Sequence, residues 1–412
     1  MPAAPTTPFS PTAQTTPTAH AMPAAHAMPA RPPVLAPLAL GPYRIWPPVV
    51  LAPMAGVTNR VFRELCAGFG GGLYVAEMVS ARALRFGDDK SWRSYVDFGP
   101  SEPIRSLQLY ATDPADVAEA VRALVEADRV DHLDLNFGCP APKITRKGGG
   151  AAIPLKPRLL AAIVAAAVAN AGSVPVTLKC RIGLDENLHT FREVGRVAEG
   201  EGCAWVALHG RTAVQLYGGA ADWAPVAELK ANCSVPVLGN GDVFTAADAL
   251  ALVARTGCDG VVIGRGCLGR PWLFAELDAA FRGEDIPPPP PFGAVMATMA
   301  DHVARLVALK GEAAALREFR KHLSWYAKGY PLGLDVRRRL AEVSTRAELE
   351  GLLAGLDPAA LPTPGSERLP RGKSSPQARV ALPEGYLDHL DDDVAPCTGG
   401  PSQAEAELVS GG

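Results

Sequence analysis

A chain of 412 residues, 48% of them hydrophobic, can bury a large core, and we expect one large domain with a smaller one attached. Pro, Gly or charge interrupts every apolar run short of a membrane span, and no basic cluster precedes an apolar stretch at the N-terminus, so neither a membrane partner nor a signal peptide is expected. The eight cysteines include no C-x-x-C pair, which disfavours a disulfide framework and a zinc site and is typical of a reducing cytoplasm.

The net charge of −3 is unevenly distributed. Residues 301–346 hold ten Lys and Arg against five Asp and Glu, whereas the acidic excess lies at the C-terminal end of the chain. A local basic surface on a neutral body is typical of a module that binds a polyanion, although a solvated helix surface gives the same composition.

Both ends of the chain have low-complexity composition. Residues 1–38 are rich in Pro, Ala and Thr and repeat the sequence Ala-His-Ala-Met-Pro-Ala at 19–24 and 25–30. Residues 359–412 are again rich in Pro, Gly, Ser and acidic groups. Such segments bury too little apolar surface to offset chain entropy, so we predict disordered tails and attach no metal site to the repeated histidines.

Short β-rich runs alternate with helical stretches between residues 39 and 286. Helical periodicity is clearest at Pro114–Ala127, Lys156–Ala171 and Ala246–Arg255. The eight runs, each nearly continuous in apolar residues, are Val49–Met54, Leu73–Met78, Ile104–Tyr110, His132–Phe137, Val174–Arg181, Ala204–Gly210, Val235–Gly239 and Gly260–Gly264. This pattern predicts an α/β fold, a closed (β/α)8 TIM barrel.

An open doubly wound sheet is the competing fold. Its main support is a G-x-G-x-x-G match over residues 264–269 after the last strand. The βαβ continuation that this motif needs is missing, because Pro287–Pro291 follows instead of another strand. We therefore favour the barrel.

The proline run at 287–291 predicts a stiff linker to a small all-helical domain over residues 292–358. On one predicted helix, Arg317, Lys321, Ser324 and Lys328 recur at helical spacing and form a polar, mostly basic face. Two apolar stripes predict the core of this domain: Met299, Val303, Leu306 and Val307, and then Leu316, Phe319, Leu323 and Tyr326. Thr345 and Glu348 have the spacing of a capping box that opens a last helix.

The most informative segment is the fourth strand, His132–Phe137, which ends in Gly138, Cys139 and Pro140. This arrangement places a thiol in a loop at the carboxyl end of a barrel strand, where α/β enzymes keep their chemistry. A buried structural cysteine is the alternative. The flanking Asn136, Gly138 and Pro140 favour the functional interpretation.

Polar residues also end the other strands, at the rim expected for an active site. A lysine inside an apolar strand is costly to bury unless an anion meets it, which makes Lys179 the most telling of them. The rim set is Gln108, Asn136, Cys139, Lys179, Arg181, His209, Arg211, Asn240 and Arg265.

Glycine-bearing turns follow the last two strands, at Gly239–Asp242 and Gly264–Gly266. Backbone N–H groups can converge on an anion at such turns, and barrels commonly bind phosphate there. A cofactor with one terminal phosphate and a ring near Lys179 matches flavin mononucleotide (FMN), because a lysine stabilises the negative charge of a reduced flavin.

Six segments in order resemble the tRNA-dihydrouridine synthases, and most closely the bacterial B-type group. The resemblance covers about residues 42–345. The segments are Leu51-Ala-Pro-Met-Ala-Gly-Val-Thr58, Asp134-Leu-Asn-Phe-Gly-Cys-Pro140, Thr177-Leu-Lys-Cys-Arg181, His209-Gly-Arg-Thr212, Gly239-Asn-Gly-Asp242 and Arg320-Lys-His-Leu-Ser-Trp-Tyr326.

This resemblance implies reduction of the 5,6 double bond of selected tRNA uridines by FMN, which NADPH (or NADH) recharges. Hydride would go to C6 of the uracil, and Cys139 would protonate C5 as a general acid. The implied cofactor residues are Pro53, Met54, Gln108, Lys179, His209, Asn240, Gly241, Asp242, Gly264 and Arg265. The implied residues for the flipped-in uracil are Asn136, Arg181 and Tyr217.

The resemblance also gives the helical domain a role, in which Arg320 and Lys321, with Arg211 on the rim, grip tRNA phosphates. It implies no obligatory protein partner. The chain departs from the family at Gly150-Ala-Ala-Ile-Pro154, where Pro154 is expected to shift the loop behind Cys139. Two alternatives stay open: a dihydroorotate-type flavin barrel for a small molecule, and an RNA-binding protein with an inactive barrel.

Overall fold

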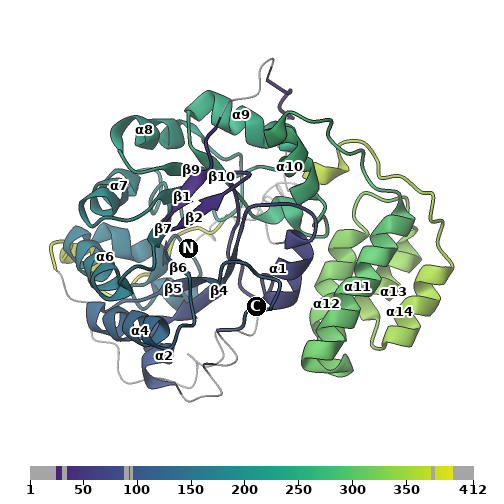
Figure 1. The fold of residues 1–412 in the computed structure, drawn as a ribbon, viewed down its shortest axis with the longest axis horizontal. Coiled ribbons are helices and arrows are strands. Elements are labelled where there is room, and N and C mark those ends of the chain that lie inside the picture. Colours follow the sequence, from purple (N-terminus) through teal and green to yellow (C-terminus); the bar gives the residue numbers. More distant parts are fainter. Residues whose placement is uncertain (1–24, 30–34, 88–91, 93–95, 373–375, 393–412) are drawn as a thin grey trace, which may run out of the picture.

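The computed structural model describes residues 25–29, 35–87, 92, 96–372 and 376–392. Eight parallel strands close into a barrel in the order β10-β3-β4-β5-β6-β7-β8-β9 (Figure 1). The strands are β3 (Val49–Leu51), β4 (Leu73–Ser80), β5 (Ser106–Tyr110), β6 (His132–Phe137), β7 (Val176–Arg181), β8 (Val206–His209), β9 (Val237–Asn240) and β10 (Gly260–Ile263). All eight predicted strands are present, and the prediction of a TIM barrel is confirmed.

The strands are apolar because they are covered on both sides. Nearly every residue of β3, β5, β8, β9 and β10 is buried, as expected for a parallel sheet with helices outside and packed side chains inside. A two-stranded hairpin that the sequence did not predict, β1 (Leu38–Leu40) and β2 (Tyr43–Ile45), packs Leu38, Leu40 and Ile45 onto the inner core. Three-residue strands carry too little periodicity to be recognised.

Helices surround the barrel and enclose its outer core (Figure 1). The three helices predicted by name are present with ends within one residue, and Thr245 and Asp248 form a capping box at the start of the third. The helices are α1 (Arg60–Ala67), α2 (Ala81–Phe86), α4 (Pro114–Glu126), α5 (Pro142–Thr145), α6 (Pro157–Ala171), α7 (Phe191–Gly200), α8 (Ala224–Asn232), α9 (Ala246–Thr256) and α10 (Leu273–Arg282), with short 3-10 turns η1 (Gly150–Leu155) and η2 (Arg265–Cys267).

Four further helices form a separate bundle beside α1 (Figure 1). Both predicted apolar stripes lie in its core, which includes Met299 and Phe319, and Val61 of α1 joins that core from the barrel. Thr345 caps the last helix by accepting a hydrogen bond from the backbone N of Glu348. The helices are α11 (Phe292–Lys310), α12 (Glu312–Tyr326), α13 (Leu334–Glu342) and α14 (Arg346–Ala354).

Helix α11 differs from the expectation that no apolar segment is long enough to span a membrane. Within the described residues it is long and apolar enough to cross a membrane by length and composition, although no segment was expected to reach that length. Its apolar side chains, such as Val295, Val303 and Leu306, are buried in the core of the helical bundle. Such burial is typical of the core helix of a bundle.

The chain beyond α14 differs from the predicted tail. The segment begins on the helical bundle, where the carbonyl of Ala360 accepts from Phe292 and the backbone N of Thr363 donates to Gly329. It then reaches the barrel through Arg368 and through residues 376–392, and it includes the 3-10 turns η3 (Ser366–Arg368) and η4 (Tyr386–Asp388), so these residues are not the disordered tail expected from composition. A few buried side chains anchor these segments, and the average composition of the segments does not reveal them. Of the predicted N-terminal tail, residues 25–29 and 35–38 are described, and the ring of His26 lies 4.7 Å from that of Trp223. The other tail residues lie outside the described part.

Arg368 supplies one of these anchors, and its loss should destabilise the fold. Its Nη2 lies 2.6 Å from Oδ1 of Asp248, and the two side chains are 5% and 0% exposed. Arg368→Ala leaves a buried carboxylate without its counter-ion, so we expect the free energy of unfolding in urea to fall by about 3–5 kcal/mol. The exposed Arg379→Ala is the matched control and should change it by less than about 0.5 kcal/mol. Equal effects of the two substitutions would contradict this assignment.

Candidate active site

The carboxyl ends of the barrel strands bring the predicted rim residues together. Each of these residues lies within the last three residues of a strand or within two residues after its end, and because the strands are parallel, those ends share one rim. Gln108 does not end its strand as expected, because β5 continues to Tyr110. The rim carries Gln108 from β5, Asn136 and Cys139 from β6, Lys179 and Arg181 from β7, His209 and Arg211 from β8, Asn240 from β9 and Arg265 from β10.

A line of side-chain hydrogen bonds crosses the barrel interior toward the rim. Thr177 donates to Oδ1 of Asp134 (2.6 Å), and Gln108 donates through Nε2 to Oδ2 of the same carboxylate (2.6 Å). Oε1 of Gln108 then accepts from Nδ2 of Asn136 at 2.8 Å. Burial raises the pKa of Asp134 to about 6 against the effect of these two donors. These bonds fix the orientation of the Gln108 amide, and they use only one of its two N–H hydrogens.

The loop that carries Cys139 is fixed by the side chain of Asn136. Its Oδ1 accepts from the backbone N–H groups of both Gly138 (3.1 Å) and Cys139 (2.8 Å). Nδ2 of Asn136 donates to Gln108 and also lies 3.5 Å from the sulfur of Met78, so all of its polar atoms have partners and Asn136 organises the loop. The backbone N of Ala151 donates to the carbonyl of Cys139 at 3.0 Å and holds the loop from behind.

The Cys139 thiol lies in surroundings that keep it protonated. Burial raises its pKa above the usual value, and the backbone at Ala141 and the charges of Arg181 and Lys143 only partly oppose this. Arg181 also bridges two rim loops, because it donates to the carbonyl oxygens of Gly138 (2.9 Å), Thr212 (3.0 Å) and Leu216 (2.9 Å). A protonated thiol held in a rigid loop is suited to act as a general acid.

Lys179 is a half-buried cation whose neighbours are mostly neutral or positive. Its Nζ donates to Oδ1 of Asn240 at 3.0 Å, and Asn240 donates to the carbonyl of Val262 at 2.7 Å. Burial, followed by the charge of Arg181, lowers the pKa of Lys179 to about 8, although Asp134 opposes the shift. A negatively charged ligand group near Nζ would therefore stabilise the charged form of Lys179.

His209 and Tyr217 lie among arginines at the β8 side of the mouth. Burial and then the charge of Arg181 lower the pKa of His209 well below its usual value, so the imidazole is neutral, and its Nδ1 has no partner among the described residues. The ring of Tyr217 lies 5.5 Å from the guanidinium of Arg181 and 4.4 Å from that of Arg265. These stacked groups form a flat, positively charged wall.

Two residues assigned from the sequence have other roles. Arg211 is 1% exposed and binds Asp242 (2.7 Å) and the carbonyls of Gly218 and Gly219, so it is not a surface contact for tRNA phosphate. Asp242 also accepts from the backbone N of Ala221 at 2.7 Å and lies 3.7 Å from Arg265, so its carboxylate organises the turn, and only its backbone N–H could face a phosphate. A sequence motif cannot distinguish a buried ion pair from a ligand contact.

The turns after β9 and β10 leave room for an anion. Gly241 has φ +123, and a Cβ there would lie 2.8 Å from that of Ala221, so only glycine fits. A Cβ on Gly264 would find only Ala52, at 3.9 Å. Burial, and then Arg211, lowers the pKa of the adjacent Arg265 to about 10, which still leaves a cation at neutral pH. Arg265 thus places a cation beside the glycine turns that follow β9 and β10.

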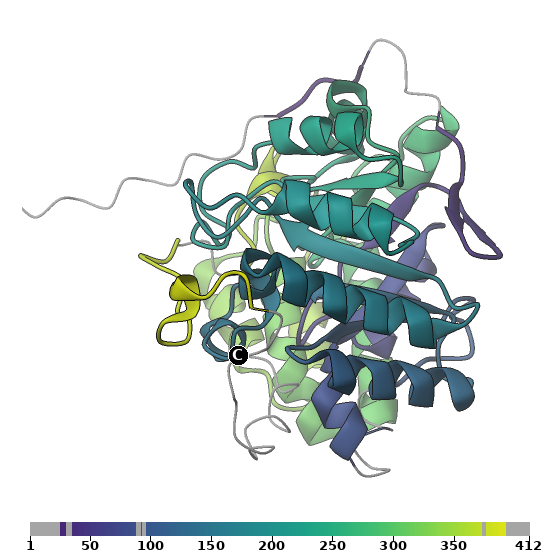
Figure 2. The same cartoon turned by 90° about the vertical axis from the view of Figure 1, so that its left-hand side faces the viewer.

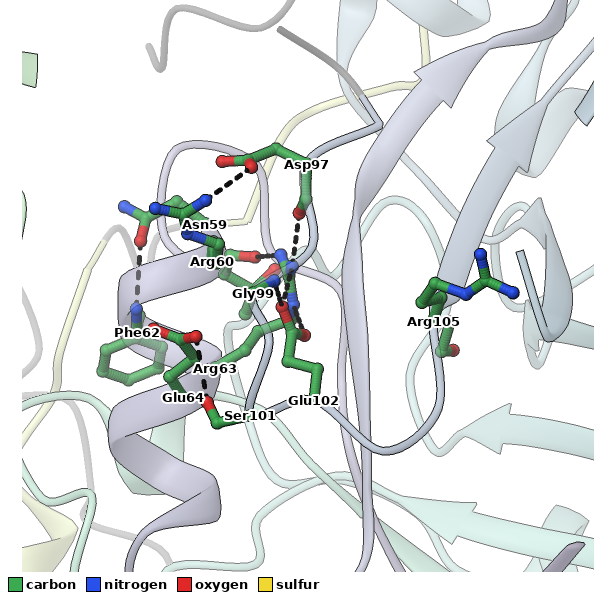
Figure 3. Close-up of polar contacts among 12 residues, drawn as sticks. Asn59, Arg60, Phe62, Arg63, Glu64, Asp97, Gly99, Ser101, Glu102 and Arg105 are labelled. Carbon is green, nitrogen blue, oxygen red and sulfur yellow. Dashed lines mark hydrogen bonds and ion pairs between the residues drawn. The ribbon is translucent and has the colours of Figure 1, made fainter. Parts of the chain in front are cut away.

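The loop containing Pro53 and Met54 is held by residues that the sequence did not single out. Glu77 accepts from the backbone N of Gly56 at 2.6 Å, and Arg63 donates to the carbonyl of Thr58 at 2.7 Å. Arg63 is almost fully buried and pairs with Glu102 at 2.6 Å (Figure 3). Charged residues within amphipathic helices usually face water, so this buried pair gave no signal in the sequence.

The helical bundle contacts this same loop through Lys321. Its Nζ donates to the carbonyl of Gly56, and burial lowers its pKa despite the nearby Glu318. Arg320 donates to the carbonyl of Val343 (2.9 Å) and to Ser344 (3.1 Å). Both side chains assigned to tRNA phosphates are thus engaged within the protein. Arg317, on the same helix, is exposed and makes no side-chain bond within the described part.

Comparison with known sequences identifies the family. The profile described as dihydrouridine synthase (Dus) matches residues 50–360. The probable tRNA-dihydrouridine synthase of Mycobacterium tuberculosis (strain ATCC 25618 / H37Rv) is 51% identical over 369 residues, 87% of this chain and 94% of the relative. The tRNA-dihydrouridine synthase B of Xanthomonas axonopodis pv. citri (strain 306) is 39% identical over 78% of this chain and 98% of the relative, and that of Pseudomonas aeruginosa (strain PAO1) is 39% identical over 72% and 89%. The chain belongs to the dihydrouridine synthase family and to its bacterial B-type group.

Proposed function

We propose that this protein reduces specific uridines in tRNA to 5,6-dihydrouridine, with FMN as cofactor and NADPH (or NADH) as reductant. The observation that carries the proposal is the position of a protonated thiol, Cys139, on the same barrel rim as the half-buried cation Lys179. A proton donor and an anion-stabilising group are what reduction of a carbon–carbon double bond requires. Because the substrate is tRNA, we place the enzyme in the cytoplasm.

The residues present fit a flavin with one phosphate. Nδ1 of His209 and Nη1 of Arg211 are buried polar atoms without a partner in the described part, as expected at a site that a polar ligand completes. We assign Pro53, Met54, Gln108, Lys179 and His209 to the ring system. We assign Asn240, Gly241, Gly264 and Arg265 to the phosphate.

The chemistry divides between cofactor and protein. When bound and reduced, FMN supplies the hydride for C6 of the uracil. Cys139 gives its proton to C5, and its raised pKa keeps that proton available at neutral pH. Lys179 holds a positive charge where the reduced flavin carries its negative charge. We assign the flipped-out uracil to a surface formed by Arg181 and the ring of Tyr217. One guanidinium nitrogen of Arg181 is not used in its contacts with the loops.

Two alternatives are weaker. A small-molecule flavin dehydrogenase would not need the helical bundle, whereas the family match runs through it to residue 360. An RNA-binding protein with an inactive barrel would not need Cys139, Lys179 and His209 on a shared rim. A colourless purified protein would favour that second alternative.

The test is direct. Flavin-loaded protein is incubated with NADPH and tRNA transcribed without modifications, and the nucleosides are analysed by mass spectrometry. We expect uridine at defined positions to gain two hydrogens. Absence of dihydrouridine with a yellow, NADPH-reducible protein would overturn the tRNA assignment and favour the small-molecule alternative.

The exposed Arg317 of α12 should contribute to tRNA binding. Arg317→Glu removes one positive charge and adds a negative one beside the RNA backbone, so we expect the Kd for tRNA to rise about tenfold at low salt, with a shallower salt dependence. The measurement is a filter-binding or anisotropy titration at several salt concentrations. Arg122→Glu, an exposed arginine on α4 at a distance from the bundle, is the matched control. An equal loss in both variants would mean that only net charge matters.

A further inference from the structure

The chain after the helical bundle returns to the barrel and lies against the loops behind the active site. Residues 376–392, which we call the C-terminal strap, run beside α6 and the loop that precedes it (Figure 2). Val380 and Tyr386 of the strap are buried in one cluster with Ala151, Ala152 and Leu155 of η1. The strap therefore covers the turn that follows the Cys139 loop.

Tyr386 fixes the strap to that turn. Its side chain is 3% exposed, and its hydroxyl lies within hydrogen-bonding distance of the carbonyl oxygens of Gly148 (3.3 Å) and Ala152 (3.1 Å). Lys156, at the end of η1, lies with Nζ 5.0 Å from the centre of the Tyr386 ring and donates to the carbonyl of His389. Pro154 has no N–H and leaves η1 one donor short, so this turn depends on outside partners.

The turn is in direct contact with the backbone of Cys139. Gly150 has φ +57, and a Cβ there would lie 2.5 Å from the carbonyl oxygen of Cys139. Ala151 donates its backbone N–H to that same carbonyl. A shift of η1 would therefore be transmitted to Cys139 without an intervening side chain.

The other end of the strap contacts the loop after β8. The backbone N of Gln377 donates to the carbonyl of Val214 at 3.0 Å, and Nε2 donates to the carbonyl of Ala213 at 3.1 Å. That loop carries Tyr217 and is bonded to Arg181, which also bonds the carbonyl of Gly138. The strap thus joins the loops after β6 and β8, which lie on either side of β7 in the barrel.

We propose that the C-terminal strap is a positioning element that holds the Cys139 loop in its reactive geometry, with Tyr386 as its main positioning residue. The inference rests on the proposed function for the identity of the reaction. Its physical basis is that small displacements of a reacting group cost large factors in rate.

The test compares full-length protein, Tyr386→Phe and a chain ended after residue 375, with a chain ended after residue 392 as the matched control. In single turnovers of reduced, flavin-loaded enzyme with tRNA, we expect flavin reoxidation to slow about tenfold for Tyr386→Phe and about a hundredfold without the strap. Flavin affinity and the rate of flavin reduction by NADPH should stay unchanged. The control truncation should match the full-length protein.

Alkylation of Cys139 by iodoacetamide across pH gives a readout that needs no tRNA. We expect a changed alkylation rate and pH profile in Tyr386→Phe but not in the control truncation. A lower Tm with unaltered turnover and alkylation would show a merely stabilising role and would overturn the proposal. If full-length protein fails to modify tRNA, the proposed function fails, whereas the alkylation result still decides whether the strap positions Cys139.

Discussion

Cys139→Ala is expected to lower the rate of dihydrouridine formation by about 10²- to 10⁴-fold, the range that a positioned general acid contributes. An alanine methyl group has no proton to give to C5. Arg181, whose charge acts on the thiol, cannot replace it, because an arginine does not release its proton at neutral pH. The measurement is single-turnover formation of dihydrouridine in tRNA, quantified by mass spectrometry.

The control is another buried cysteine at the far end of the barrel. Cys233 follows α8 and precedes β9, so it lies on the side away from the rim, and Cys233→Ala should leave the turnover rate unchanged. Flavin binding should be retained in both variants, because the Cys139 side chain makes none of the contacts assigned to the phosphate. Wild-type turnover by Cys139→Ala would exclude the thiol as the proton donor.

The barrel and its rim were predictable because their signals are local. Eight apolar runs separated by amphipathic helices define a parallel barrel, and several polar residues that interrupt these runs, such as Lys179, fall in the last three residues of a strand. The periodicity of α11 and α12 similarly defined the core of the helical bundle. These features can be recognised from residues that are close together in the sequence.

What the sequence could not provide were the partners of charged side chains. Arg211 and Lys321 look like phosphate contacts as isolated basic residues, but their partners, Asp242 and the carbonyl of Gly56, are set by tertiary contacts. The same limit hid the Arg63–Glu102 pair, whose members are 39 residues apart. The strap was missed because its anchoring residues are diluted in a Pro- and Gly-rich segment.

The contacts between bundle and barrel also change how the helical domain should be tested. Deleting residues 292–412 would remove the helical domain to which tRNA binding is assigned. That deletion would expose Val61 in the bundle core, free the Gly56 carbonyl from Lys321 and leave Asp248 without Arg368. Loss of activity would then report unfolding as readily as loss of tRNA contacts. Single changes on the exposed face, such as Arg317→Glu, avoid this ambiguity.

Lys179→Met is expected to lower the rate of flavin reduction by about 10²- to 10³-fold, the range for loss of one preorganised electrostatic group. The pKa of Lys179 is lowered to about 8, so the cation is present below that pH and is lost as pH rises through it. In wild-type enzyme, flavin reduction by NADPH should therefore fall above about pH 8. The thiol of Cys139 does not produce this decline, because its pKa is raised and flavin reduction does not use its proton.

Lys179→Arg is the matched variant for the pH profile, because a guanidinium stays charged throughout this range. It should lose the decline near pH 8 while keeping more activity than Lys179→Met, whose low rate should be independent of pH. Stopped-flow absorbance of the bound flavin measures all three profiles. A wild-type profile that stays level beyond pH 8, or a Lys179→Met profile with the same decline, would show that another group titrates, and the electrostatic role of Lys179 would then have to be abandoned.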